Sequence, residues 1–519
     1  MTGFSPTSRK FPRSIFSNGS FMHLKNFAVF FLFSLLLILT GCGRKKKEVS
    51  GNSFIFNPVD TSFTGKEFLL PGGNYKVERL YTEGDLEKVE WKGVMAPAKG
   101  KHDFIVFLPI NGSATHGILW VNHESILPDT VMGHGGGASV LEVFRDSLLG
   151  WKSVGFPHAI NFGSVGGTLH NCLGVLTPWG TILTSEEIEP ANNFVRNPND
   201  STKKLLPDSS DFNGRPRWMN YGWMVEVDPL KREVLGKRHA MGRFMHEGNA
   251  AMADEKTFYM CDDEAPGAFF KFVADTARNL NSGQLYAWCM QADSNGKHWI
   301  SIPRGRDTLL HARRHAFQRG ASIFIRMEDI EQLPDGSFLI TETGKDSVSL
   351  ATAIAQGGKV MPHLEKYHVG KQIYDDRHGR ILRYDPKTET ITVFLEGGQA
   401  LEDRSIVLSN PDNLAYNKTR NMLVIQEDLN GTSGGRVPAK PGAVKICEIY
   451  FLDLKNPKPI LDNLKRFAVI PAGCESTGAC WSSDYSSLFF NIQNEGDKKN
   501  PAKPPYDKSV TVVVTGFPE

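Results

Sequence analysis

The sequence predicts an all-β protein, a six-bladed β-propeller with helical and loop insertions. Glycine (50 residues) and proline (29 residues) are spread along the 519-residue chain, so turns are frequent and long helices are disfavoured. Hydrophobic residues make up 40% of the chain, which is enough for a sizeable core. From about residue 171 onward, a pattern of two short strands joined by a turn recurs at intervals that suit propeller blades.

The first 41 residues have the features of a bacterial lipoprotein signal peptide. An apolar run at 27–39 follows Lys25 and is too short to span a bilayer, which takes about 20 residues. It leads into Leu39-Thr40-Gly41-Cys42, which resembles the lipobox of bacterial lipoproteins and implies lipidation of Cys42. Met22 is a second candidate for the start, because residues 1–21 are not needed for the signal.

We therefore expect an exported protein of the cell envelope, held to the membrane by a lipid anchor. The alternative is an N-terminal membrane anchor that is never cleaved. Residues 42–75 are expected to form a tether, and residues 76–519 a single propeller domain. The formal net charge is only +2, and the sequence has no basic helix, so no nucleic-acid partner is expected.

Two strands are predicted ahead of the repeats, at 103–108 and at 117–124, and the second ends in polar groups. A glycine run at 135–137 follows, and the apolar spacing of 138–149 predicts a helix. The segment 117–124 is taken as part of a sixth unit.

Each repeat begins with a potential ligand residue on a short strand, and its second strand ends in acids or amides. The five units start near residues separated by 75, 81, 84 and 63 positions: Cys172, Glu247, Glu328, Asp412 and Glu475. The turn is explicit at Pro334-Asp335-Gly336, a strong hairpin signal. Further strand candidates between the units bring each period to about four strands, as expected of a blade.

This recurrence predicts a shared site, because the innermost strands of all blades line one channel. Carboxylates gathered there repel each other and lose hydration, so they require cations. Oxygen ligands of this kind suit calcium. For any single acid pair, a solvated surface hairpin is the simpler interpretation, and only the recurrence argues against it.

Cys172 occupies the position at which other units carry an acid. An isolated buried cysteine is most often an inert small hydrophobic residue. As a metal ligand, its thiolate would favour iron over calcium. It is also a candidate nucleophile, since His170 lies two residues away as a possible base. We rank metal ligand above nucleophile.

Several motifs between about residues 100 and 497 resemble those of the PhoX-type bacterial alkaline phosphatases, and they occur in that family's order. They are Asn171-Cys172, Thr177-Pro178-Trp179-Gly180-Thr181, Glu186-Glu187, His246-Glu247-Gly248, Glu328-Asp329-Ile330-Glu331, Asn410-Pro411-Asp412-Asn413-Leu414-Ala415, Thr477-Gly478 and Asn491-Ile492-Gln493. The resemblance implies a six-bladed propeller that hydrolyses phosphate monoesters, such as small-molecule phosphate esters, with a cluster of iron and calcium ions.

Carried over by motif position, the resemblance implies iron binding by Cys172. It implies metal binding by a set of carboxylates, namely Glu186 or Glu187, Glu247, Glu328 and Glu475, with Asp263 and Asp412 as further candidates. No side chain is assigned as the nucleophile, and an oxygen bound to the metals is expected to attack the phosphoryl group. Two features depart from the family: Ser185 stands where a cysteine is common, and no twin arginine precedes Phe27.

Two alternatives remain open at this stage. Asp412, Asn413 and Glu427 would also suit a calcium-dependent, lactonase-like propeller hydrolase with one divalent ion in its channel. A non-catalytic surface binding protein, whose ions only stabilise the blades, is the third interpretation. A requirement for the Cys172 thiol separates the phosphatase from the lactonase-like enzyme.

Overall fold

The computed structural model describes residues 56–59, 67–127, 129, 131–132, 135–193, 196–197, 200–204, 212–398, 408–428, 446–455, 463–494 and 502–518. The predicted signal peptide, Cys42 and most of the predicted tether lie outside these residues. Residues 51–519 form one compact unit. Within the described part of the chain, no helix has the length and apolar content needed to cross a membrane.

The described residues contain six sheets of four or more strands, each built largely from consecutive strands. From the inside outward, the first sheet consists of β4 (His102–Pro109), β5 (His116–His123), β6 (Ala138–Asp146), β7 (Gly150–Ala159), β2 (Leu86–Val89) and β3 (Val94–Pro97). The second consists of β8 (Asn171–Leu176), β9 (Ile182–Glu186), β12 (Met224–Asp228) and β13 (Glu233–Lys237). The third consists of β14 (His246–Ala251), β15 (Thr257–Asp262), β16 (Phe270–Thr276), β17 (Asn279–Trp288) and β18 (Trp299–Ser301).

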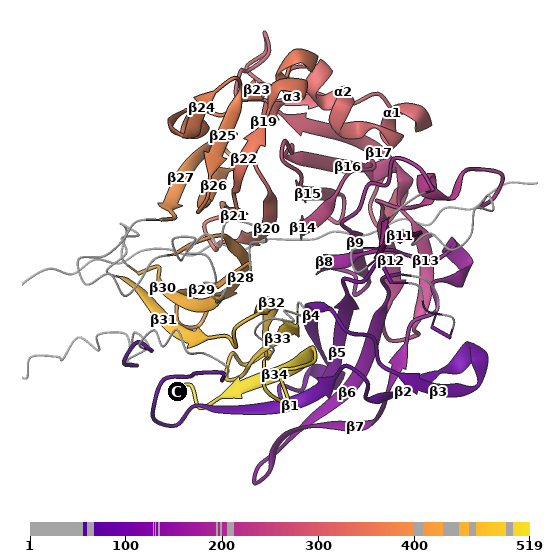
Figure 1. Ribbon diagram of the computed structural model, residues 1–519, viewed down its shortest axis with the longest axis vertical. Helices are drawn as coiled ribbons and strands as arrows, with labels where there is room; N and C mark the ends of the chain where they lie inside the picture. The colour runs from indigo at the N-terminus through magenta and orange to yellow at the C-terminus, as the bar shows by residue number, and fades with distance from the viewer. Residues whose placement is uncertain are drawn as a thin grey trace, which may run out of the picture. The chain divides into compact units, whose positions relative to one another are not determined.

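The other three sheets follow the same plan. They are β20 (Met327–Gln332), β21 (Phe338–Glu342), β26 (Arg380–Asp385) and β27 (Thr390–Glu396); β28 (Pro411–Asn417), β29 (Met422–Glu427), β30 (Glu448–Asp453) and β31 (Leu464–Val469); and β32 (Cys474–Trp481), β33 (Leu488–Asn494), β34 (Val510–Thr515) and β1 (Lys76–Thr82). In the last sheet β1 pairs with β34, so the early and late parts of the chain close one blade together (Figure 1).

The first strands of the six sheets form a closed ring. Each contacts the next in the order β4, β8, β14, β20, β28 and β32, and β32 contacts β4. The sheets radiate from this ring as blades (Figure 1). The predicted all-β propeller is therefore confirmed.

Apolar faces of neighbouring blades pack on one another to form the core. Leu119 and Leu141 of the first sheet, for example, share a buried cluster with Phe489 and Val513 of the last. Each such side chain contributes about 1.5–3 kcal/mol through burial. The blades are thus held around the channel by many separate apolar contacts.

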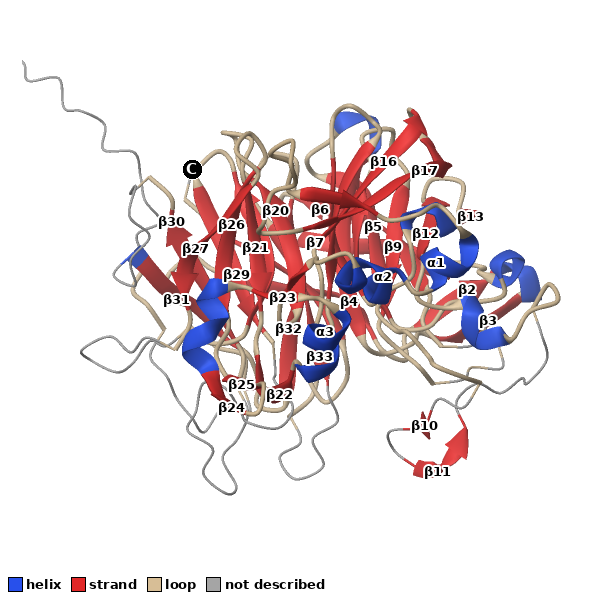
Figure 2. Ribbon diagram, turned by 90° about the horizontal axis from the view of Figure 1, so that it is seen from above, coloured by secondary structure: helices blue, strands red, loops and turns tan. Residues whose placement is uncertain are grey.

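The described helices and smaller sheets of the insertions lie beside the blades (Figure 2). The α-helices among the described residues are α1 (Arg306–Leu310), α2 (Ala312–Gln318) and α3 (Ala351–Gln356). The smaller sheets pair β10 (Arg196–Asn197) with β11 (Asp200–Lys204), β19 (Ser322–Ile323) with β23 (Lys359–Val360), and β22 (Lys345–Ser349) with β25 (Ile373–Asp376) and β24 (His368–Gly370).

The helix predicted at 138–149 is wrong, because this segment forms strand β6. Leu141 and Val143 are buried while Glu142 and Phe144 are exposed, which is the alternation of a strand. Pairing with β5 on one side and β7 on the other decides the structure over the local apolar spacing.

Candidate metal centre

The second residue of each first strand is a carboxylic acid or a cysteine. These six residues are Asp103, Cys172, Glu247, Glu328, Asp412 and Glu475. In five of the six strands, from β4 to β28, a β-bulge lies at this residue. In β8, for example, Asn171 pairs with Glu186 and the next paired residue, Gly174, pairs with Thr184, so β8 has one residue more than β9 over this stretch. Because a bulge bends the strand and re-aims its side chains, it turns these residues out of the regular sheet pattern.

The residue before the first strand also recurs in an unusual conformation. Lys101, His170, Arg326 and Asn410 have φ between 50° and 57°, in the left-handed region. Such a residue reverses the chain sharply as it enters the strand. At His170 and Arg326 the side chain then meets acids of the candidate metal centre.

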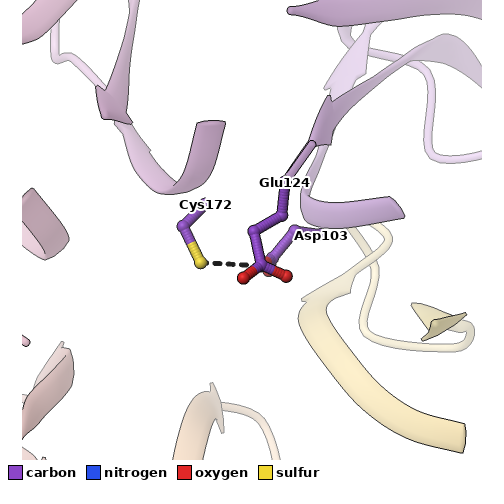
Figure 3. A group of neighbouring side chains, drawn as sticks. All are labelled: Asp103, Glu124 and Cys172. Carbon is purple, nitrogen blue, oxygen red and sulfur yellow. Dashed lines mark hydrogen bonds between the residues drawn. The ribbon is translucent and has the colours of Figure 1, made fainter. Parts of the chain in front are cut away.

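Side chains from five blades meet at one end of the channel. In four overlapping groups, the potential ligand atoms lie within 4.8 Å of one another: Asp103, Glu124 and Cys172; Glu124, His170 and Glu187; Cys172, Glu187 and Glu247; and Glu247, Glu328 and Asp412. We call these eight residues the channel cluster. Figure 3 shows Cys172 beside Asp103 and Glu124, with the Cys172 thiol donating to Asp103 Oδ2 at 2.8 Å.

Burial and mutual repulsion disfavour negative charge in the channel cluster. Burial raises the pKa of Asp103 and of Glu187 to about 8, and nearby carboxylates add to the shift. Burial, followed by the charges of neighbouring acids, also raises the pKa of Cys172 and of Glu247 well above their usual range. A cation would reverse these shifts by stabilising the charged forms.

The donor set fits metal ions. Asp103 Oδ1 is buried and has no hydrogen-bond partner among the described residues, so it has an acceptor position to offer. Carboxylate oxygens suit a hard cation such as calcium, and a thiolate among them suits a softer transition metal.

The structure separates the two members of the Glu186-Glu187 pair. Glu186 forms a fully buried ion pair with Lys237 at 2.8 Å and accepts hydrogen bonds from the backbone of Leu169 and Trp223. Glu187, the next residue, instead lies 2.9 Å from His170 and belongs to the channel cluster. Glu186 therefore stabilises the blade, while Glu187 faces the shared centre.

The adjacent acids Asp262 and Asp263 also have different partners. Asp262 pairs with Arg313 of α2 at 2.6 Å, while Asp263 pairs with Arg326 at 3.0 Å. Arg326 also pairs with Glu328 at 2.5 Å and with Asp428 at 2.7 Å. These acids raise the pKa of Arg326 further despite its burial, so a permanent cation borders the channel cluster.

Of the eight predicted metal residues, the channel cluster contains Cys172, Glu187, Glu247, Glu328 and Asp412. Glu186 and Asp263 are held by ion pairs as described. Glu475 lies on β32 opposite Gln493 and is in none of the four groups.

Asp103, Glu124, His170 as a cluster member and Arg326 were not predicted. The signal for the first two was available, because Asp103 begins the strand expected at 103–108 and Glu124 ends that expected at 117–124. Aligning that unit with the later repeats would have placed both at the ligand positions.

The nucleophile interpretation of Cys172 is not favoured by this geometry. The thiol donates to Asp103, whereas His170 Nδ1 lies 2.9 Å from Glu187 and Nε2 lies 3.3 Å from Glu124. His246 is fully buried and hydrogen-bonded to the Gly242 carbonyl, as expected of a structural histidine.

The fold and the site together define a β-propeller with a candidate metal centre at one end of its channel. The sequence profile of the family described as alkaline phosphatase PhoX matches residues 149–496, and the chain belongs to this family. It is therefore a phosphoric monoester hydrolase of the PhoX type, and the lactonase-like and non-catalytic alternatives are set aside.

Among solved structures, the chain is similar to PhoX of Pseudomonas fluorescens in complex with vanadate, a transition state analogue. The two are 21% identical, with a TM-score of 0.66, and the match covers 89% of this chain and 97% of that chain. The PQQ-bound aldose sugar dehydrogenase of Streptomyces coelicolor matches at 11% identity and a TM-score of 0.35, covering 86% of this chain and 99% of that one. No curated protein sequence matches the chain.

Proposed function

We propose that this chain hydrolyses phosphate monoesters at a cluster of calcium and iron ions held by the channel cluster. The observation that carries the proposal is the meeting of acids and one thiol from five blades in four overlapping groups, each with its ligand atoms within 4.8 Å of one another. Buried carboxylates without cations destabilise the fold, so this arrangement indicates bound metal.

The ligand types divide the cluster between two kinds of ion. Glu187, Glu247, Glu328 and Asp412 offer oxygen atoms that suit calcium. Cys172, with Asp103 beside it, offers the soft ligand that suits iron. When bound, such ions neutralise phosphoryl oxygens and activate an oxygen nucleophile, so no side chain is required as the nucleophile.

Arg326 is proposed to bind the phosphate group of the substrate. Its guanidinium contacts acids of two further blades, Asp263 and Asp428, and it reaches Glu328 inside the channel cluster. A planar guanidinium matches the geometry of phosphate oxygens and keeps its charge at any pH of interest. The acids around Arg326 restrain its side chain before the substrate arrives.

The enzyme is further proposed to be exported and anchored at the cell envelope through a lipid on Cys42. The apolar run at 27–39 and the lipobox-like Leu39-Thr40-Gly41-Cys42 support this proposal. Labelled fatty acid should be incorporated into the full chain and not into a Cys42→Ala variant. Equal labelling of both chains would refute the anchor.

Elemental analysis together with a phosphatase assay tests the catalytic proposal. The purified protein should contain calcium and iron and should hydrolyse several phosphate monoesters. A chelator should abolish hydrolysis, and added metals should restore it. Metal-replete protein without activity on any ester would overturn the proposal, and calcium without iron would overturn the assignment of Cys172.

A further inference from the structure

We propose that a cavity beside the channel cluster binds the leaving group of the substrate, and that this group carries a ring and a second negative charge. The inference rests on the proposed function, since it names the substrate class for the same site. The cavity measures about 450 Å³ and is lined by residues of the loop after β5, the loop before β8, the 3₁₀ turn after β2 and the segment 212–217.

One wall of the cavity is hydrogen-bonded to two residues that are sequence neighbours of channel-cluster members. Gly137, which lines the cavity, accepts a hydrogen bond from His123 N at 2.9 Å and donates to Asn171 Oδ1 at 2.7 Å. His123 directly precedes Glu124, and Asn171 directly precedes Cys172. The cavity wall therefore lies close to the backbone that carries two members of the channel cluster, near the proposed position of the organic part of a bound ester.

Three aromatic rings line the cavity: Trp91, Phe162 and Phe212. Trp91 and Phe212 are partly exposed, so their rings are accessible to a ligand. Arg217 lies over the Phe212 ring, with 5.8 Å between its guanidinium carbon and the ring centroid. Aromatic side chains in a cavity pack favourably against a ring of the ligand. The adjacent guanidinium further favours a ligand ring that carries a negatively charged substituent.

The polar lining is also suited to an anion. Among the described lining residues, Lys92, Lys99 and Arg217 outnumber one acid, Asp129. Lys99 and Arg217 also donate to backbone carbonyls of the lining glycines, which holds their charges at the cavity. The Asp129 carboxylate already accepts hydrogen bonds from the backbone of Val131 and Met132 at 2.7 and 2.6 Å, so it is engaged by its own loop.

Two esters that differ only in the ring test the aromatic part of the inference. The ratio of kcat/KM for phenyl phosphate to that for methyl phosphate should fall roughly tenfold in Phe212→Ala and in Trp91→Ala. It should not change in Phe144→Ala, which removes an exposed ring of β6 outside the cavity. Because the ratio is internal to each variant, a partly misfolded preparation does not affect it. A ratio equal to that of the wild type in both cavity variants would overturn the inference.

A second pair of esters tests the charge. The preference for 4-carboxyphenyl phosphate over phenyl phosphate should fall about three- to tenfold in Arg217→Gln and stay constant in Lys152→Gln, an exposed cation of β7. An unchanged preference in Arg217→Gln would overturn the anionic part. A wild-type protein that hydrolyses none of these esters would refute the proposed function and this inference together, whereas active variants with unchanged ratios would refute the inference alone.

Discussion

The Cys172 thiol donates a hydrogen bond to Asp103 Oδ2 across 2.8 Å, and so joins the first strands of two neighbouring blades. The two residues are 69 positions apart in the sequence, and each is the second residue of its strand. The only soft ligand of the channel cluster thus lies directly against one of its hard ligands. This contact marks the place at which a thiolate-preferring metal would bind.

Cys172→Ser should remove iron while retaining most of the calcium. A hydroxyl is a poor ligand for iron compared with a thiolate, and even loss of a supporting contact typically lowers metal affinity about 10- to 100-fold. Elemental analysis of the purified variant measures both metals. Cys289→Ser is the matched control, because Cys289 is also buried but donates to the Gly320 carbonyl away from the cluster. Equal loss of iron in both variants would contradict the assignment.

Glu186→Gln and Glu187→Gln should fail in different ways although the residues are adjacent. Glu186→Gln leaves Lys237 buried without its counter-charge, which should cost about 3–5 kcal/mol of the free energy of unfolding. Glu187→Gln should instead lower the metal content, because it removes charge from the channel cluster. Denaturant unfolding and metal analysis of the folded protein separate the two effects. A metal loss in Glu186→Gln that equals the loss in Glu187→Gln would show that both acids bind metal.

This pair illustrates what sequence can predict. Glu247, Glu328 and Asp412 were recognisable because each begins a repeat of the same form. Glu186 and Glu187 were not separable, since adjacent residues at a strand end point in different directions and only Lys237, on another strand, identifies the structural member. The role of Arg326 could not be predicted for a similar reason, because its three acidic partners come from different strands or loops.

Removal of metal should destabilise the protein more at pH 8 than at pH 5. Burial raises the pKa of Asp103 and of Glu187 to about 8 in the folded protein without metal, above their usual values near 4. Groups with a raised pKa stabilise the fold at low pH, and this contribution is lost as the pH rises toward the folded value. The melting temperature with chelator should therefore fall between pH 5 and pH 8, and calcium should restore it at pH 8. A metal-free melting temperature that rises across this range would contradict the cluster as described.

Acid should destabilise a different part of the propeller through Glu342. Despite full burial, which raises the pKa, the charges of His363 and Arg380 lower the pKa of Glu342 to about 2. A lowered pKa gives stability above the usual value near 4.5, and this stability is lost as the pH falls toward 2, for a total of roughly 3 kcal/mol. In chelator-treated protein, Glu342→Gln should flatten the decline of the unfolding free energy between pH 5 and pH 3. An unchanged slope would mean that Glu342 is not charged in the fold.

Arg326→Gln should weaken the binding of phosphate esters. The variant removes a charge-assisted contact to the phosphate, and such contacts are worth about 1.5–3 kcal/mol, so KM should rise roughly 10- to 100-fold. Arg326→Lys should recover part of this loss, because it keeps the charge but not the planar pair of donors. Arg304→Gln is the control, since Arg304 forms an exposed ion pair with Asp275. If Arg326 only positions Glu328, its loss should instead lower metal content and kcat together, and steady-state kinetics at saturating calcium and iron distinguishes these results.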